Sequence, residues 1–289
     1  MKKILTVIVV MVFALAGCGK ATDEKEVKFS DVMNDKKETI SYVVTVNSDD
    51  SPSIGKNSDI LQYIISKNGK ITVYNSNDDN LGKLTKMSDD EKIKYIKKSD
   101  KKHFEDDKST SLSALKDKLK DTEKNLKTDI ENGNSEHTVA ESNTTTMREH
   151  YENNIKSLKK SIKKVENTNY KKPTSQNLVI EVSTDETGNN TKEEFINVEP
   201  HGFEGVYSGK YIDSKKSANP KEYGEYFTNV VSPTEIYDTK VAGIGNIDYV
   251  EDDSSYVNYD DYMYLVTEVG DKTEKFNLDQ PDDKNVKEK

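Results

Sequence analysis

Cysteine, tryptophan and arginine are scarce in this chain of 289 residues. Cys18 is the single cysteine, Arg148 is the single arginine, and there is no tryptophan. One cysteine excludes an intramolecular disulfide, because a disulfide needs two thiols within bonding distance. A chain of this length can fold without one, since it is long enough to bury a sizeable core.

Positive charge is also in deficit. The formal net charge is −10, whereas a general nucleic-acid binder needs a clear excess of cations to neutralise phosphates. We therefore expect no nucleic-acid partner. Hydrophobic residues make up only 32% of the chain, but 16 tyrosines and 7 phenylalanines supply bulky groups to bury. This composition predicts a modest core with long polar loops rather than a disordered chain.

The sequence lacks the motifs of common enzymes and cofactor sites. None of the four histidines, His103, His137, His150 and His201, has a partner at a recognised metal-ligand or triad spacing. There is no Gly-x-Ser-x-Gly elbow, and the glycines are too scattered for a phosphate-binding loop. We expect no catalytic residue and no cofactor. A hydrolase with a carboxylate pair stays an alternative, because 53 acidic residues always offer pairs.

The amino-terminal segment has three parts. Lys2 and Lys3 precede an apolar run over 4–14 that only Thr6 interrupts, and Leu15-Ala16-Gly17-Cys18 follows. The run falls short of the roughly 20 residues that span a bilayer, which disfavours a transmembrane anchor. An ordinary secretory signal needs no cysteine at this place, yet the chain puts its single cysteine there.

This segment resembles the lipobox of bacterial lipoproteins. The resemblance implies that residues 1–17 are a signal peptide, that Cys18 carries diacylglyceryl, and that the protein stays on the outer face of the cytoplasmic membrane. The abundance of Lys, Asn, Asp and Tyr in the remaining chain is similar to that of lipoproteins from AT-rich Gram-positive bacteria. Two acyl chains suffice for stable anchoring, whereas one chain binds only marginally.

Two β regions are predicted on either side of a helical region. Asn68-Gly69 between apolar runs over 60–66 and 71–74 is a strong hairpin signal, because both turn positions need positive φ. The run over 39–46 predicts a further strand. In the second β region we expect a hairpin over 178–198, a short helix over 220–231, and strands over 235–241, 262–269 and 273–278.

The helical region has two apolar stripes. Ser88 and Glu91 form a capping box that starts the first helix, and Gly133 is a natural stop. The spacings of three, four and seven in the stripes are typical of a coiled coil, so we expect an antiparallel helical hairpin. The stripes consist of Leu112, Leu115, Leu119, Leu126 and Ile130 in the first helix and Tyr151, Ile155, Leu158, Ile162 and Val165 in the second.

These patterns predict an α+β fold, with antiparallel β regions and an inserted antiparallel helical hairpin. The expected segments are the signal peptide 1–17, the lipidated cysteine with a flexible tether 18–37, an N-terminal β region 38–82, a helical region 83–172, a C-terminal β-rich region 173–278 and a charged tail 279–289.

Charge is distributed unevenly. Residues 83–172 hold 22 basic and 17 acidic residues, whereas residues 173–289 hold 11 and 25. This difference has two simple explanations: the two segments attract each other, or their charges are solvated. The alternative is that one basic face of the helical region binds an anionic partner such as lipid head groups or a cell-envelope polymer. That face consists of Lys156, Lys159, Lys160, Lys163 and Lys164.

The stretch over 249–264 interleaves acids with tyrosines. Its carboxylates are weak candidates for a calcium site, although the ligand spacing of an EF-hand is missing; they are Asp252, Asp253, Asp260 and Asp261. Its tyrosines are candidates for stacking on sugar rings or holding a cationic peptide; they include Tyr256, Tyr259 and Tyr262. Acidic turns between tyrosine-bearing strands explain the same residues without any ligand.

We therefore expect a lipid-anchored extracytoplasmic surface protein that acts as a non-enzymatic interaction module. Its partner would be a cell-envelope component or another protein. A solute- or ion-binding lipoprotein is the first alternative, and it requires a deep cleft between two α/β lobes. An envelope hydrolase is the second, and it requires polar groups clustered in a pocket.

Overall fold

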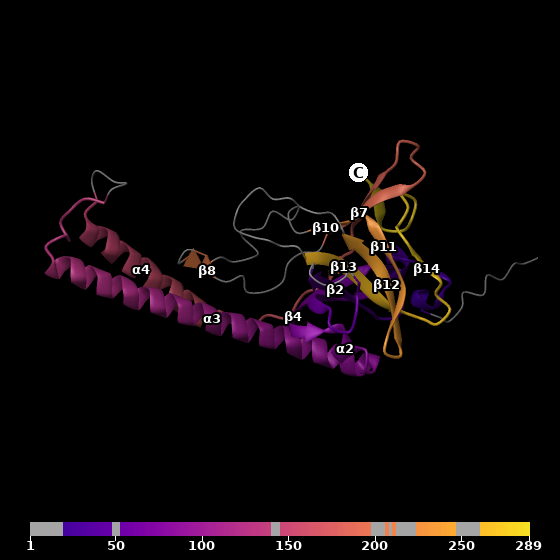
Figure 1. Ribbon diagram of the computed structural model, residues 1–289, viewed down its shortest axis with the longest axis horizontal. Helices are drawn as coiled ribbons and strands as arrows, with labels where there is room; N and C mark the ends of the chain where they lie inside the picture. Colours follow the sequence, from indigo (N-terminus) through magenta and orange to yellow (C-terminus); the bar gives the residue numbers. More distant parts are fainter. Residues whose placement is uncertain are drawn as a thin grey trace, which may run out of the picture.

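The computed structural model describes residues 20–47, 53–139, 145–197, 206–207, 210–211, 224–246 and 261–289. The fold is α+β, as the sequence predicts. A body of two packed β-sheets carries a long helical hairpin that extends from one end (Figure 1).

The larger sheet has seven antiparallel strands and joins both β regions. Its order is β11 (Asn229–Ile236), β12 (Thr239–Asn246), β13 (Asp261–Val269), β2 (Thr39–Asn47), β3 (Asp59–Lys67), β4 (Lys70–Asn80) and β5 (Gln176–Asn177). The central pairing of β2 with β13 places Val44 opposite Tyr264. The predicted β3–β4 hairpin is confirmed, and its turn residues Asn68 and Gly69 have φ of 54° and 73°.

A smaller sheet covers one face of the larger one. Its order is β10 (Gly224–Phe227), β7 (Thr191–Asn197), β6 (Ile180–Thr184) and β15 (Val286–Glu288). Alternation along β2 sends Val43 into the core between the sheets, where it lies with Ile180 and Phe227. The 3₁₀ turn η1 (Ala21–Asp23), strand β1 (Glu26–Lys28), helix α1 (Phe29–Asn34) and strand β14 (Lys275–Asn277) close this core at one side. The remaining short strands β8 (Val206–Tyr207) and β9 (Lys210–Tyr211) pair with each other.

Helices cover the other face of the seven-stranded sheet. Helix α2 (Leu81–Leu84) and the first turns of α3 (Asp89–Glu131) pack on the residues that alternate with Val43 along β2. Leu81 and Ile96 lie with Tyr42 and Val44 in this second core. Both faces of the sheet are therefore buried.

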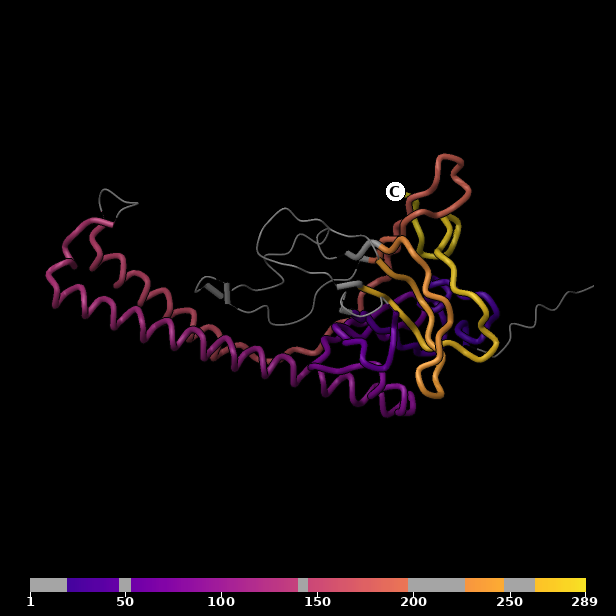
Figure 2. The backbone as a smooth tube through the Cα atoms, viewed as in Figure 1, coloured from indigo at the N-terminus to yellow at the C-terminus, as the bar shows by residue number. Residues whose placement is uncertain are grey.

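Helix α3 continues far beyond the sheet as one arm of the hairpin (Figure 2). Its 43 residues span about 65 Å at 1.5 Å per residue. The Ser88–Glu91 capping box starts it, and Gly133 at φ 73° follows its end, as the sequence predicts. Helix α4 (Met147–Glu166) returns along α3 and begins with a second capping box, formed by Thr146 and Glu149.

The core of the hairpin is thickest near the body. Phe104, Leu115, Leu158 and Val165 are buried there, with Ile162 half-buried beside them. Towards the tip, beyond Leu115 and Leu158, the apolar side chains of both helices are half-buried at most. The narrow stripes in the sequence therefore give a narrow core.

Asp79 on β4 fixes the base of α3 to the sheet. Its buried carboxylate accepts hydrogen bonds from Tyr63 Oη at 2.6 Å, Ser99 Oγ at 2.7 Å and Lys83 Nζ at 2.8 Å, and Tyr95 Oη also donates to it. Burial alone would raise the pKa of Asp79, but these donors outweigh burial and lower it to about 2. The carboxylate is therefore ionised and bonded at neutral pH.

Replacing Asp79 by Asn is expected to lower the free energy of unfolding by about 3 kcal/mol, because Lys83 loses its charged partner and an amide NH2 replaces one of the two oxygens that accept hydrogen bonds. Urea unfolding at neutral pH measures this. Asp117→Asn on the exposed part of α3 is the control and should cost less than about 0.5 kcal/mol. Equal losses in the two variants would contradict the role given to Asp79.

The flexible tether predicted for residues 18–37 is wrong over its described part, 20–37. Val27, Phe29, Val32 and Met33 are at most 1% exposed in the core between the sheets. These apolar residues are isolated among charged ones in the sequence. Their burial depends on the parallel pairing of β1 with β14, about 250 residues away, which no local pattern indicates.

Three predictions at the carboxyl-terminal side are also wrong. The charged tail 279–289 is folded, since Asp279 is buried and β15 pairs in parallel with β6. The described part of the predicted helix over 220–231 consists of strands β10 and β11, and the predicted strand over 235–241 is broken by the turn at Tyr237 and Asp238. Valine and tyrosine suit a strand as well as a helix, and sheet pairing decides between them.

Candidate functional site

The lysines singled out in the sequence lie together on α4. All five, Lys156, Lys159, Lys160, Lys163 and Lys164, are exposed, and the stretch 153–165 that contains them has no acidic residue. Leu158 and Val165 face α3 in the core of the hairpin, so the lysines occupy the remaining surface of α4. The arm therefore presents a basic face, which we define as these five lysines.

Part of this charge has a structural reason. Lys163 and Lys164 lie in the last turn of α4, where cations stabilise the helix dipole. Lys159 Nζ pairs with Glu123 of α3 at 2.9 Å, and both side chains are about half exposed. Such a pair contributes at most about 1 kcal/mol. The mid-helix position of Lys156 and Lys160 has no comparable explanation from helix stability.

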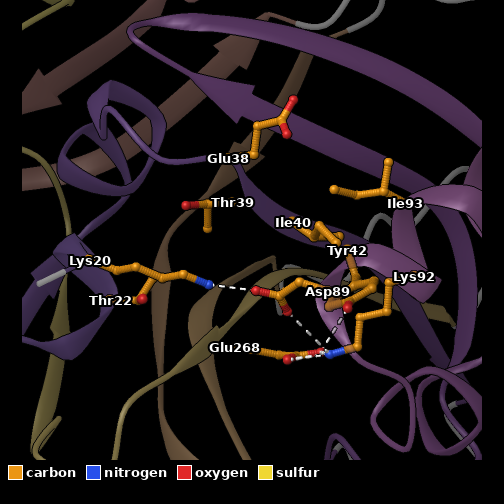
Figure 3. Close-up of a pocket in the computed structure, with 10 residues that line it drawn as sticks. All are labelled: Lys20, Thr22, Glu38, Thr39, Ile40, Tyr42, Asp89, Lys92, Ile93 and Glu268. Carbon is orange, nitrogen blue, oxygen red and sulfur yellow. Dashed lines mark hydrogen bonds and ion pairs between the residues drawn. The ribbon is translucent and has the colours of Figure 1, made fainter.

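A small polar cavity lies between the start of α3, strands β2 and β13, and the amino-terminal segment (Figure 3). Buried Lys92 of α3 pairs with Glu268 of β13 at 2.6 Å, and Tyr42 Oη donates to the same carboxylate at 2.8 Å. Lys20 pairs with Asp89 at 2.7 Å across the cavity mouth. The cavity measures about 40 Å³, which suits a few water molecules and is far below the roughly 300 Å³ of a small-molecule site.

We therefore interpret this cavity as a structural junction. Its lining residues come from segments that are distant in the sequence, and their ion pairs hold the amino-terminal segment against α3. The lining consists of Lys20, Thr22, Glu38, Thr39, Ile40, Tyr42, Asp89, Lys92, Ile93 and Glu268.

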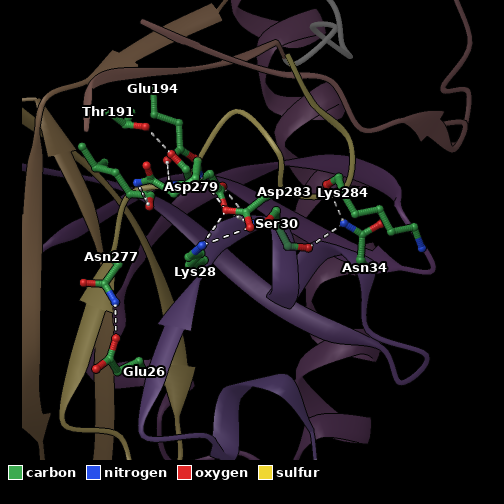
Figure 4. A network of polar contacts seen from close by, with 12 residues as sticks. Glu26, Lys28, Ser30, Asn34, Thr191, Glu194, Asn277, Asp279, Asp283 and Lys284 are labelled. Carbon is green, nitrogen blue, oxygen red and sulfur yellow. Dashed lines mark hydrogen bonds and ion pairs between the residues drawn. The ribbon is translucent and has the colours of Figure 1, made fainter. Parts of the chain in front are cut away.

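A second polar network joins the amino- and carboxyl-terminal segments (Figure 4). Glu194 of β7 and Asp279 are both completely buried. Glu194 Oε2 accepts the Asp279 N–H at 3.0 Å, and the Asp279 carboxylate accepts the Ser30 N–H of α1 at 2.9 Å. Lys28 pairs with Asp283 at 2.7 Å beside them.

Burial governs the protonation of this acid pair. Burial raises the pKa of Asp279 to about 6, although the N–H of Ser30 opposes the change. Burial, together with the negative charge of Asp279, raises the pKa of Glu194 well above its usual range. The raised pKa favours the protonated form of Glu194, and protonation removes the repulsion between the two carboxylates.

The acid pair predicts an unusual pH dependence of stability. The folded protein holds the Asp279 proton more tightly than the unfolded chain, so its stabilisation is complete below about pH 4 and is lost as pH rises through about 6. Glu194 adds to the loss in the same direction, because its pKa is also raised on folding. For Asp279 the loss is about 3 kcal/mol. Glu194→Gln mimics the protonated acid, so urea unfolding at about pH 5 and about pH 8 should show a smaller loss than in the wild type.

Glu193→Gln is the matched control, since Glu193 is adjacent and exposed. Its unfolding should keep the pH dependence of the wild type. A Glu194→Gln protein with that same dependence would contradict the interpretation that folding raises the pKa of Glu194.

Most of the other candidates from the sequence have no described side chain. Cys18, Asp252, Asp253, Tyr256, Tyr259 and Asp260 lie outside the described residues, and only the backbone of Asp261 and Tyr262 is described, in β13. On α3, His103 Nε2 lies 3.1 Å from Asp107 Oδ2, and on α4, His150 Nε2 lies 3.0 Å from Asn154 Nδ2. Within the described ranges, no group of three or more His, Cys, Asp or Glu side chains is arranged to hold a metal ion.

Sequence reasoning missed both buried polar networks. Lys92 and Glu268 are 176 residues apart, and Glu194 and Asp279 are 85 residues apart. In a chain with 33% charged residues, single acids and lysines carry no local signal of burial.

In the part of the chain that the structure describes, no helix combines the length and the apolar character needed to cross a membrane. No known protein family, curated protein or solved structure matches this chain.

Proposed function

We propose that the protein is a lipid-anchored interaction module on the outer face of the cytoplasmic membrane, and that the basic face of α4 binds an anionic polymer of the cell envelope. The anchor is diacylglyceryl on Cys18, which the lipobox at residues 15–18 supports. The single observation that supports the binding role is the group of five exposed lysines in the acid-free stretch 153–165, on an arm that projects from the body.

The shape of the arm suits an extended partner. Helix α4 presents lysines along more than two turns, so a chain of phosphates or carboxylates can meet several of them at once. Each exposed contact contributes less than about 1 kcal/mol, and only their number gives useful affinity. Binding of this kind weakens as salt screens the charges.

The architecture of the body favours this function over solute binding. A solute-binding lipoprotein of the expected type needs two α/β lobes with a cleft between them. The described residues instead form one sandwich around a shared seven-stranded sheet, with both faces of that sheet buried.

The anchor is tested with Cys18→Ala. Without the thiol no thioether to diacylglycerol can form, so the variant should leave the membrane fraction and appear in the soluble fraction of its host. Quantitative fractionation of both proteins measures this. A variant that remains as firmly bound to the membrane as the wild type would contradict lipid anchoring.

The binding face is tested by replacing its five lysines with glutamine. We expect affinity for soluble poly(glycerol phosphate) to fall by about tenfold or more at about 0.05 M NaCl, and the salt dependence of the remaining binding to flatten. Titration calorimetry at low and high salt measures both quantities.

The matched control removes five exposed lysines from the other helix of the same arm. Lys116, Lys118, Lys120, Lys124 and Lys127 of α3 alternate with acidic residues, so their surface has no net basic field. This variant should bind within about threefold of the wild type. Equal losses of affinity in the two variants would mean that only net charge matters, and would contradict the assignment of the binding site to α4.

A further inference from the structure

The folded body begins very close to the proposed anchor. Lys20 is the first described residue, and in the lipidated protein only Cys18 and Gly19 precede it. Two extended residues span at most about 7 Å. If Cys18 carries the proposed lipid anchor, this short distance requires the surface around Lys20 to lie against the bilayer.

Hydrogen bonds identify the segments around Lys20. Its Nζ pairs with Asp89 at the start of α3, at 2.7 Å. Two residues further, the carbonyl oxygen of Thr22 accepts the N–H of Gly270 at 2.7 Å, in the turn that follows β13. The beginning of α3 and the β13–β14 turn therefore share this end of the molecule with Lys20.

The turn between β11 and β12 lies at the same end (Figure 1). Thr239 Oγ1 donates to the carbonyl oxygen of Thr85, just before α3, at 3.2 Å. Lys240 Nζ donates to the carbonyl oxygen of Asp271 in the β13–β14 turn at 2.8 Å. These two contacts hold the β11–β12 turn between the two segments that surround Lys20.

Tyr237 at this turn is an unusual residue for its position. Its φ is 54°, a left-handed conformation that glycine and asparagine adopt readily but a bulky side chain adopts at a cost of about 1 kcal/mol or more. Its side chain is 50% exposed, so packing in the body does little to offset that cost. Lys86 Nζ lies 4.3 Å from the centre of its ring.

We propose that this end of the body contacts the lipid surface, with the Tyr237 ring placed among the head groups and Lys86 beside it. Tyrosine is enriched at membrane–water interfaces because its ring is apolar and its hydroxyl is polar. The surrounding charges are mixed, since Asp89, Asp90, Asp238 and Asp271 are also exposed there. The contact therefore depends on the ring and the anchor rather than on net charge, and it forms on zwitterionic lipid.

This contact sets the direction of the arm. Helix α3 starts beside Lys20 and ends 42 residues later at Glu131, so its far end lies about 60 Å from the anchored end. The basic face of α4 then stands away from the membrane that carries the protein. Its anionic partner is a polymer of the envelope rather than the head groups of that membrane.

The natural chain contains no tryptophan, so one substitution introduces a single fluorescent probe. Tyr237→Trp is placed in the full lipidated protein, which is reconstituted on phosphatidylcholine vesicles that contain brominated lipid. Tyr151→Trp on α4 near the tip is the matched probe. We expect Trp emission at position 237 to shift to the blue and to be quenched at low and high salt, and emission at position 151 to be unchanged.

Each alternative result contradicts a stated claim. A protein that floats with the vesicles but is not quenched at position 237 contradicts the contact and leaves the anchor standing. Quenching at both positions means that the arm lies flat, which overturns its direction. Failure to float contradicts the anchor itself, and with it this inference. Asp238→Trp, on the same exposed turn, gives the same readout if Tyr237→Trp does not fold.

Discussion

The backbone pairing of β2 with β13 holds together parts of the chain that are more than 200 residues apart, and the other features of the body follow from it. Once these strands are neighbours, both β regions become one seven-stranded sheet, and the helical hairpin becomes an excursion between β4 and β5. These two strands are themselves paired through Lys70 and Asn177, so the chain rejoins the sheet beside the start of β4, at the opposite end of that strand from Asn80, where it leaves.

Buried charges fix how the arm and the chain ends sit on this sheet. Asp100 of α3 accepts hydrogen bonds from the N–H of Asn75 on β4 and from Tyr170 Oη, which follows α4, so a single carboxylate contacts both ends of the excursion. Lys92 and Glu268 add an ion pair at the base of α3. Ion pairs of this kind add little net stability compared with apolar side chains, but they disfavour other arrangements, because a displaced partner would leave a buried charge alone.

Signals that act over a few residues predicted the structure well. Asn68-Gly69, the Ser88 capping box and the leucine stripes each specify local geometry, and the corresponding hairpin, helix start and helical pair are present. Residues 20–37 and 279–289 carry no such local signal, because their order comes from partners far away in the chain. The regular spacing of the α4 lysines predicts that they share one face of a helix. The cavity beside Lys20 depends on contacts between residues at least 69 positions apart, which no local spacing predicts.

The thin core of the arm has a consequence for how such a protein changes over evolution. Beyond Leu115 and Leu158 no apolar side chain of the two helices is fully buried, and neither the sheet nor the buried carboxylates depend on how far the helices continue. Matched insertions or deletions of seven residues in both helices would keep the stripes in register while moving the tip by about 10 Å each. The arm is thus a spacer whose reach can be lengthened or shortened without redesigning the domain that carries it.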